Sequence, residues 1–221
     1  MLRARLLCIV LTLLATMAAA QPVPTANQPP STRLQALKAI EHPAPAVRRA
    51  AVARLGEIGT MADADRLVAR LRDDDAPVRQ LAEAALWQVW SRSGDHAIDA
   101  LFLRGVEQMA ASQRAEALAT FSEIIRRKPA FAEGWNKRAT VYYLLGQYDL
   151  SMKDCDEVLK RNRNHFGALS GYGQIYLARG DPERAQPYLE RALKVNPNMA
   201  GTAAAIRQIE LYREQKRQRT I

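Results

Sequence analysis

The chain has 221 residues, 48% of them hydrophobic, and a formal net charge of +9 at pH 7. A chain of this length can form one or two folded domains. Its basic residues are spread along the chain instead of forming one basic face, which argues against a nucleic-acid-binding protein. Of the two cysteines, only Cys155 lies outside the N-terminal apolar segment, so we expect no intramolecular disulfide.

Residues 1–20 have the layout of a secretory signal peptide. Two arginines precede an apolar run over residues 6–15 and the small residues 18–20. Because this run is shorter than the roughly 20 residues that span a bilayer, the sequence predicts cleavage after Ala20, no membrane span, and a periplasmic or secreted protein. A mitochondrial transit peptide is the alternative, since no acidic residue precedes Glu41. Such peptides are amphipathic, however, and the apolar run has no polar face.

The next segment, residues 21–31, contains four prolines and no apolar periodicity. This composition predicts a flexible, extended linker. Beyond it almost every segment has the apolar spacing of a helix, and no stretch alternates apolar and polar residues for long enough to form a sheet. The sequence therefore predicts an all-α fold.

Residues 32–93 repeat with a period of 31 residues, so that Ala46-Val47-Arg48 matches Pro77-Val78-Arg79. The pattern predicts two helices in each unit, at 32–41 and 45–58, then at 62–72 and 76–91. Pro45 and Pro77 fall in first turns, where a missing N–H costs nothing, and Asp75 is placed to cap the last helix. These segments resemble short HEAT-type repeats, which implies two such units over residues 32–93.

A longer repeat, of 34 residues, runs through residues 98–199 as units 98–131, 132–165 and 166–199. Matching positions are Trp135 and Leu169, Ala139 and Gly173, Tyr142 and Tyr176, Gly146 and Gly180, Leu159 and Leu193, and Asn162 and Asn196. A period of this length is typical of stacked helical hairpins. Units two and three resemble the tetratricopeptide repeat (TPR). Unit one departs from that pattern, with Ser112 in place of the turn glycine.

The resemblance implies a right-handed helical-hairpin solenoid in which HEAT-type units, TPR units and a capping helix follow one another continuously. Gly105 and Gly173 would let the helices of a hairpin approach closely, and Gly146 and Gly180 suit a left-handed turn. Trp87 and Trp90 end the last HEAT-type helix, so we expect them to form the seam between the two arrays.

The sequence of the C-terminal segment, residues 200–221, predicts a capping helix at about 199–217 and a basic tail. Ile206, Ile209 and Tyr212 recur at helical spacing and are expected to pack on the helix around 182–195. Such a helix would cover the apolar face that the last repeat exposes. The basic residues here are Arg213, Lys216, Arg217 and Arg219.

In TPR arrays the first helix of each unit lines a concave groove. Carried onto this sequence, the resemblance implies partner-binding positions at Phe102, Val106, Asn136, Lys137, Thr140, Tyr143, Ser170 and Gln174. We expect binding to centre on unit two and Asn136 and Lys137 to lie outside the packing positions. The residues that clamp a C-terminal carboxylate in some members of the family are absent, because Phe102 and Gly171 stand at some of those positions. The same positions could equally form an idle solvated surface.

No residue pattern predicts an enzyme, a cofactor or a metal site. The three histidines, His42, His96 and His165, fall at helix ends or in linkers and lack partners at metal-ligand spacing. Cys155 occupies an inward helix position typical of a small buried hydrophobe. The three aspartates at 73–75 lack the alternating spacing of a calcium loop and predict a solvated turn with a helix cap.

Together these features predict a non-enzymatic scaffold in the cell envelope that binds another protein or an extended peptide, with a small-molecule ligand less favoured. Two alternatives stay open. The HEAT-type segments resemble those of bilin lyases, which would make the chain an accessory factor of an envelope or pigment-attachment enzyme. The basic C-terminal tail could instead associate with an anionic surface, where each basic residue adds about 1 kcal/mol.

Overall fold

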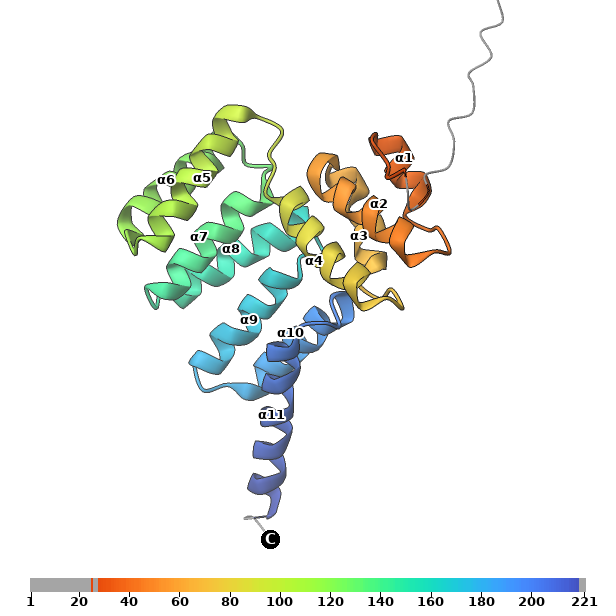
Figure 1. Cartoon of the computed structure of the whole chain (residues 1–221). Coiled ribbons are helices and arrows are strands. Elements are labelled where there is room, and N and C mark those ends of the chain that lie inside the picture. Colours follow the sequence, from red (N-terminus) through yellow and green to blue (C-terminus); the bar gives the residue numbers. More distant parts are fainter. Residues whose placement is uncertain (1–24, 26–27, 219–221) are drawn as a thin grey trace, which may run out of the picture.

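The computed structural model describes residue 25 and residues 28–218, and this part of the chain is helical throughout, as predicted (Figure 1). Its extended backbone pairing is limited to one isolated bridge between Thr25 and Gln28. No helix in the described part is long and apolar enough to cross a membrane. The predicted signal peptide and most of the predicted linker lie outside the described residues.

The first array consists of four α-helices and a short 3-10 turn. They are α1 (Arg33–Ala39), α2 (Pro45–Ile58), η1 (Met61–Asp63), α3 (Ala64–Arg70) and α4 (Ala76–Trp90). Helices α2 and α4 pack along each other, and Leu55, Leu67 and Leu86 between them and α3 are fully buried. Burial of this apolar face, at roughly 25 cal/mol per Å², holds the array together.

The aspartates before α4 differ from one another in environment. Asp75 caps α4 by accepting a hydrogen bond from the Val78 N–H at 2.9 Å, as predicted. Asp73, by contrast, is buried and accepts two hydrogen bonds from Arg48, at 2.6 and 2.9 Å. The expectation of a wholly solvated turn is therefore wrong for Asp73, because a long-range ion pair takes it into the core.

The second array contains three helical hairpins and a last helix. They are α5 (His96–Ala110) with α6 (Arg114–Arg127), α7 (Ala132–Leu144) with α8 (Tyr148–Arg161), α9 (Phe166–Ala178) with α10 (Pro182–Val195), and finally α11 (Ala200–Gln218). Each hairpin packs on the next. A Cβ added at Gly105 or Gly173 would lie only 2.7 Å from Phe121 or 2.2 Å from Leu189. Glycine is thus needed for the close approach of the paired helices.

The turns that follow the first helices of the hairpins share a left-handed residue. Gly146 has a φ of 69° and Gly180 a φ of 71°, which agrees with the prediction and costs glycine little. Unit one keeps the same backbone with a serine, because Ser112 has a φ of 60°. This turn is therefore strained relative to the other two.

The two arrays do not form one continuous stack. Helices α4 and α5 make few contacts. The first array instead folds back onto the start of α9 and the turn that precedes α11, where Phe166 and Met199 join its core. Arg72 donates to the Val195 carbonyl at 3.2 Å, and Asn198 donates to the Leu71 carbonyl at 2.8 Å. The expected continuity of the solenoid is thus broken at this joint, although each array keeps its helical-hairpin packing.

Helix α11 caps the second array over part of its length only. Ile209 is buried, and Ile206 packs beside it, as predicted. Tyr212 is 52% exposed, so its predicted packing is wrong. The apolar packing ends near Ile209, because the last part of α11 projects from the body of the molecule (Figure 1). Arg213, assigned to the basic tail, donates a hydrogen bond to Gln186.

Candidate partner-binding pocket

A pocket of about 390 Å³ lies where α4 of the first array meets the first helices of units two and three, α7 and α9. Five of the eight predicted binding residues line it: Asn136, Thr140, Tyr143, Ser170 and Gln174. They come together because positions that repeat every 34 residues face the same side of a hairpin stack. The pocket is therefore a section of the concave surface with α4 as an added wall.

The wall supplied by α4 consists of Glu83 and Trp87, which are one helical turn apart and share a face. The Trp87 ring contacts Phe166 at the start of α9, with ring centroids 5.2 Å apart and nearly perpendicular planes. The prediction that Trp87 and Trp90 form the seam is confirmed. Neither pocket residue of α4 was predicted as a binding residue, because the sequence does not indicate which part of the second array the seam would meet.

Small residues of α9 create the space in the pocket. A Cβ at Gly167 would lie 2.7 Å from the Trp87 ring, so glycine is what lets the two helices come together there. Gly171 is different, because a Cβ at this position would meet only the Cys155 sulfur, at an ordinary 3.7 Å. Gly171 therefore leaves room that a larger side chain could occupy.

Beneath the pocket, Glu133 and His165 form a fully buried pair. Nε2 of His165 lies 2.5 Å from a Glu133 oxygen, and Nδ1 accepts a hydrogen bond from the Ala168 N–H at 3.0 Å. Nδ1 is thus used as the acceptor for the start of α9, and Nε2–H donates to the Glu133 carboxylate. Burial by itself raises the pKa of Glu133, but the contacts with His165, the charge of Lys137 and the hydrogen bond from Asn136 outweigh it and lower this pKa.

The Glu133–His165 pair belongs to the seam as well as to the second array. The Trp90 ring stacks on the His165 ring with centroids 4.5 Å apart. Asn136, which lines the pocket, donates to Glu133 at 3.1 Å. One hydrogen-bonded chain thus runs from the pocket floor to the joint between the arrays. This role of His165 was missed, because its sequence position indicates only a helix end.

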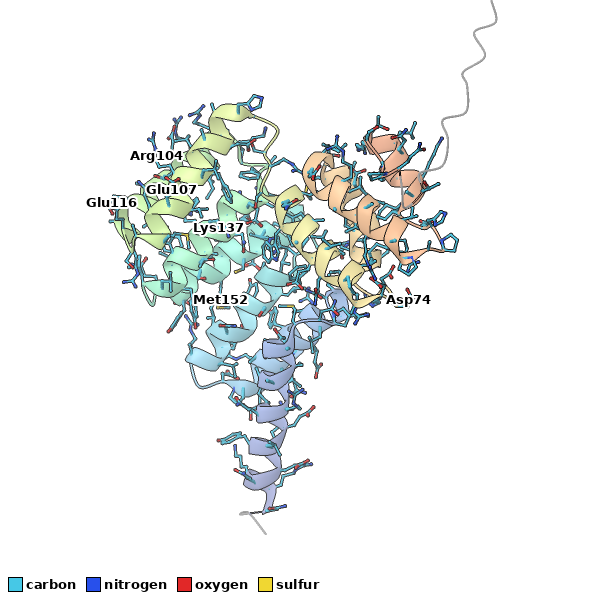
Figure 2. The ribbon with its side chains drawn as sticks, viewed as in Figure 1. Asp74, Arg104, Glu107, Glu116, Lys137 and Met152 are labelled. Carbon is cyan, nitrogen blue, oxygen red and sulfur yellow. The ribbon has the colours of Figure 1, made fainter. Side chains whose placement is uncertain are left out.

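The other predicted residues lie in varied environments. Lys137 of α7 (Figure 2) is half-buried, and its ammonium group lies 5.8 Å from the centre of the Trp87 ring, which lines the pocket. Val106 is 36% exposed on α5 and does not line the pocket. Phe102 is 4% exposed and packs between Phe121 and Phe131. The expectation that Phe102 lines an open groove is wrong, because its large ring turns into the hairpin core.

Asn136 and Ser170 are each only 8% exposed, so they form the floor of the pocket. The expectation that Asn136 lies outside the packing positions is therefore wrong, since its amide is bonded to the buried Glu133 carboxylate. Thr140, Tyr143 and Gln174 are more accessible. The groups that a ligand could reach are thus mainly hydroxyl, amide and aromatic.

The thiol of Cys155 on the pocket wall is not activated. Burial, followed by the charges of Asp154 and Asp156, raises the pKa of the Cys155 thiol to about 12, so the sulfur on the pocket wall stays protonated and is a poor nucleophile. Within the described residues, no group of histidine, cysteine or acidic side chains has the arrangement of a metal site.

Comparison with known proteins finds similarity to both repeat types. A model of HEAT repeats matches residues 12–87, and a model of the tetratricopeptide repeat matches residues 130–198. A TPR repeat-containing protein of Rhizobium etli is 35% identical over 108 residues, which are 49% of this chain and 53% of that protein. Anaphase-promoting complex subunit 7 of Dictyostelium discoideum is 28% identical over 86 residues, 39% of this chain and 15% of that protein. The chain therefore spans about half of the first relative and much less of the second.

A solved structure similar to this one is the first TPR of Spaghetti (RPAP3) bound to the HSP90 peptide SRMEEVD. The TM-score is 0.50 with 23% sequence identity, and the match covers 52% of this chain and 91% of that one. The likeness is one of fold.

Proposed function

We propose that this chain, with its HEAT repeats followed by tetratricopeptide repeats, is a non-enzymatic scaffold that binds an extended segment of another protein. The binding site is the pocket between α4, α7 and α9. Repeat arrays of this kind expose long curved surfaces suited to protein segments.

The observation that carries the proposal is the meeting of α4 with the predicted concave surface. Five predicted residues line one pocket together with Glu83 and Trp87 of the HEAT array. Its volume of about 390 Å³ lies within the range of roughly 300–1,000 Å³ that is usual for ligand pockets. This space suits one large anchoring side chain, and such anchors supply most of the energy at protein interfaces.

Exposed apolar residues favour a protein segment over a small molecule. Leu144, on the pocket wall, is 47% exposed, and on α5 Leu103 is 62% and Val106 36% exposed. An extended segment anchored in the pocket could cover such neighbours, which a small molecule inside it could not reach. The fold neighbour bound to an HSP90 peptide supports this type of ligand.

A pocket-filling substitution tests the proposal. Gly171→Leu places a side chain where the added Cβ meets only Cys155 at 3.7 Å, and leucine favours a helix more than glycine does. The variant should keep or raise the melting temperature while closing the pocket. The matched control is Gly201→Leu on α11, where an added Cβ meets nothing within 4 Å.

The probe is a displayed library of random nine-residue peptides, selected on the wild-type protein and on both variants. We expect enriched peptides that bind the wild type and Gly201→Leu and lose binding to Gly171→Leu. Equal enrichment of the same peptides on Gly171→Leu would show that the binding site lies outside the pocket. The absence of any enriched peptide on the wild type would refute the proposed function.

We further propose that the scaffold acts in the cell envelope after export, on the strength of the basic, apolar and small-residue layout of residues 1–20. Cell fractionation with N-terminal sequencing tests this. The expected product starts at Gln21 in the envelope fraction, whereas a cytosolic protein that starts at Met1 would refute export.

A further inference from the structure

Glu83 is the one charged residue among those that line the pocket, and the residue is half-buried. In the described part of the chain it has no hydrogen bond or ion pair. Arg79, one turn earlier on α4, donates instead to the carbonyls of Asp73 and Asp74 at 2.8 and 3.1 Å. A half-buried charge gains free energy from a partner that enters the pocket with the opposite charge.

The nearby basic side chain does not fill this role. Lys137 places its ammonium group over the Trp87 ring, 5.8 Å from its centre, and it does not line the pocket. Behind the pocket floor, the Glu133 carboxylate is already occupied by hydrogen bonds from His165 and Asn136. Glu83 therefore gives the lining of the pocket a negative charge, in a protein whose net charge is +9.

The apolar lining suits the stem of a long basic side chain. Trp87, Tyr143 and Phe166 contribute aromatic surface to the pocket. Lysine and arginine bury their methylene stems against such surfaces and keep the charged head at a polar group. Trp87 and Glu83 lie one helical turn apart on α4, so a stem packed on the ring can bring its head to the carboxylate.

We propose that the pocket selects its partner by a lysine or arginine side chain, which pairs with Glu83 and packs its stem against Trp87. This inference rests on the proposed function, because it names the chemistry of the segment that the scaffold binds. An acidic side chain would instead meet the negative charge of Glu83.

Charge-matched peptides test the selectivity. The enriched peptide from the library is synthesised with lysine at its anchoring position, with norleucine, which keeps the stem and removes the charge, and with glutamate. Affinities for the wild type are measured by fluorescence anisotropy. We expect the lysine peptide to bind about tenfold or more tightly than the norleucine peptide, which is the size of one charged hydrogen bond, and the glutamate peptide to bind weakest.

Substitution of Glu83 identifies the partner of the cation. Glu83→Gln should remove the preference for lysine over norleucine, and Glu83→Lys should reverse it in favour of glutamate. The matched control is Glu116→Gln, an equal charge change at an exposed residue of α6, at the outer edge of the second array (Figure 2). It should keep the preference, and melting temperatures should confirm that every variant is folded.

The outcomes separate this inference from the proposed function. Peptides that depend on the pocket but lack a basic residue, or that bind equally with lysine and norleucine, would overturn the charge selectivity and leave the scaffold function intact. A lysine preference that survives in Glu83→Gln would also overturn it. A library without any pocket-dependent peptide would overturn both.

Discussion

Removal of the Glu133 carboxylate should destabilise the protein severely, because this group is the acceptor at the centre of the buried chain between pocket and seam. In Glu133→Ala, the Nε2–H of His165 loses its acceptor at 2.5 Å, and the Asn136 amide loses the one at 3.1 Å. The side chains of Glu133 and His165 are both 0% exposed, so water cannot replace the lost bonds without entering the core.

The size of the expected loss in stability follows from the two donors, on His165 and Asn136, that lose their acceptor. Each buried donor without a partner costs roughly 1–3 kcal/mol, and the breaking of a buried pair by removal of one member typically costs about 3–5 kcal/mol. We expect a loss of about 3–5 kcal/mol in the free energy of unfolding, against a total stability of about 5–15 kcal/mol for a folded domain. The matched variant Glu133→Gln keeps an oxygen acceptor of the same shape and should lose about 1 kcal/mol, the net worth of an ordinary hydrogen bond.

Urea titration measures both variants, with circular dichroism for the helices and tryptophan fluorescence for the seam at Trp87 and Trp90. A loss below about 1 kcal/mol in Glu133→Ala, less than the cost of one orphaned donor, would refute the structural role of the pair. Equal losses in the alanine and glutamine variants would show that the carboxylate charge, and not its capacity to accept hydrogen bonds, is what the site requires.

Three further predictions follow from single features of the fold. Ser112→Gly should stabilise the chain by about 0.5–1 kcal/mol, since it relieves a left-handed serine, while Gly146→Ser should destabilise it by a similar amount in the same urea assay. Because the fold lowers the pKa of Glu133, the stabilisation from its ionised form is present above the ordinary glutamate pKa of about 4.3 and is lost as pH falls through the lower folded value. The stability difference between wild type and Glu133→Gln should therefore narrow in acid. A chain that ends at Glu210 should keep the melting temperature of the wild type, whereas one that ends at Met199 should aggregate, because it loses Ile209; equal behaviour of both would refute the cap.

Local features of the fold could be predicted from the sequence because they depend on neighbouring residues and on period. The 34-residue spacing places equivalent residues on equivalent faces, so Thr140 and Gln174 reach the same pocket. Left-handed turns at Gly146 and Gly180 follow from what glycine alone adopts at low cost. Caps such as Asp75 follow from hydrogen bonding within one turn.

Long-range features could not be predicted in this way. The seam depends on a few side chains that are far apart in sequence, such as Trp90 on His165 and Arg72 on the Val195 carbonyl. Periodicity carries no information about where one array will touch another. The size of a side chain also matters more than its position in the repeat. Phe102 and Asn136 occupy equivalent repeat positions but pack on different neighbours.

The turn before α9 links the two arrays and the pocket through single residues. His165 caps α9 through Nδ1, donates to Glu133 of α7 and stacks on Trp90 of α4. Asn136 carries the same chain of hydrogen bonds to the pocket floor. Any movement of α4 relative to α9 must therefore disturb a buried pair whose bonds water cannot replace, and the same movement would separate Trp87 and Glu83 from the rest of the pocket. The pocket and the seam therefore depend on the same contacts. A segment that binds across α4, α7 and α9 should stabilise the first array against unfolding, even though most of its contacts would lie on helices of the second array.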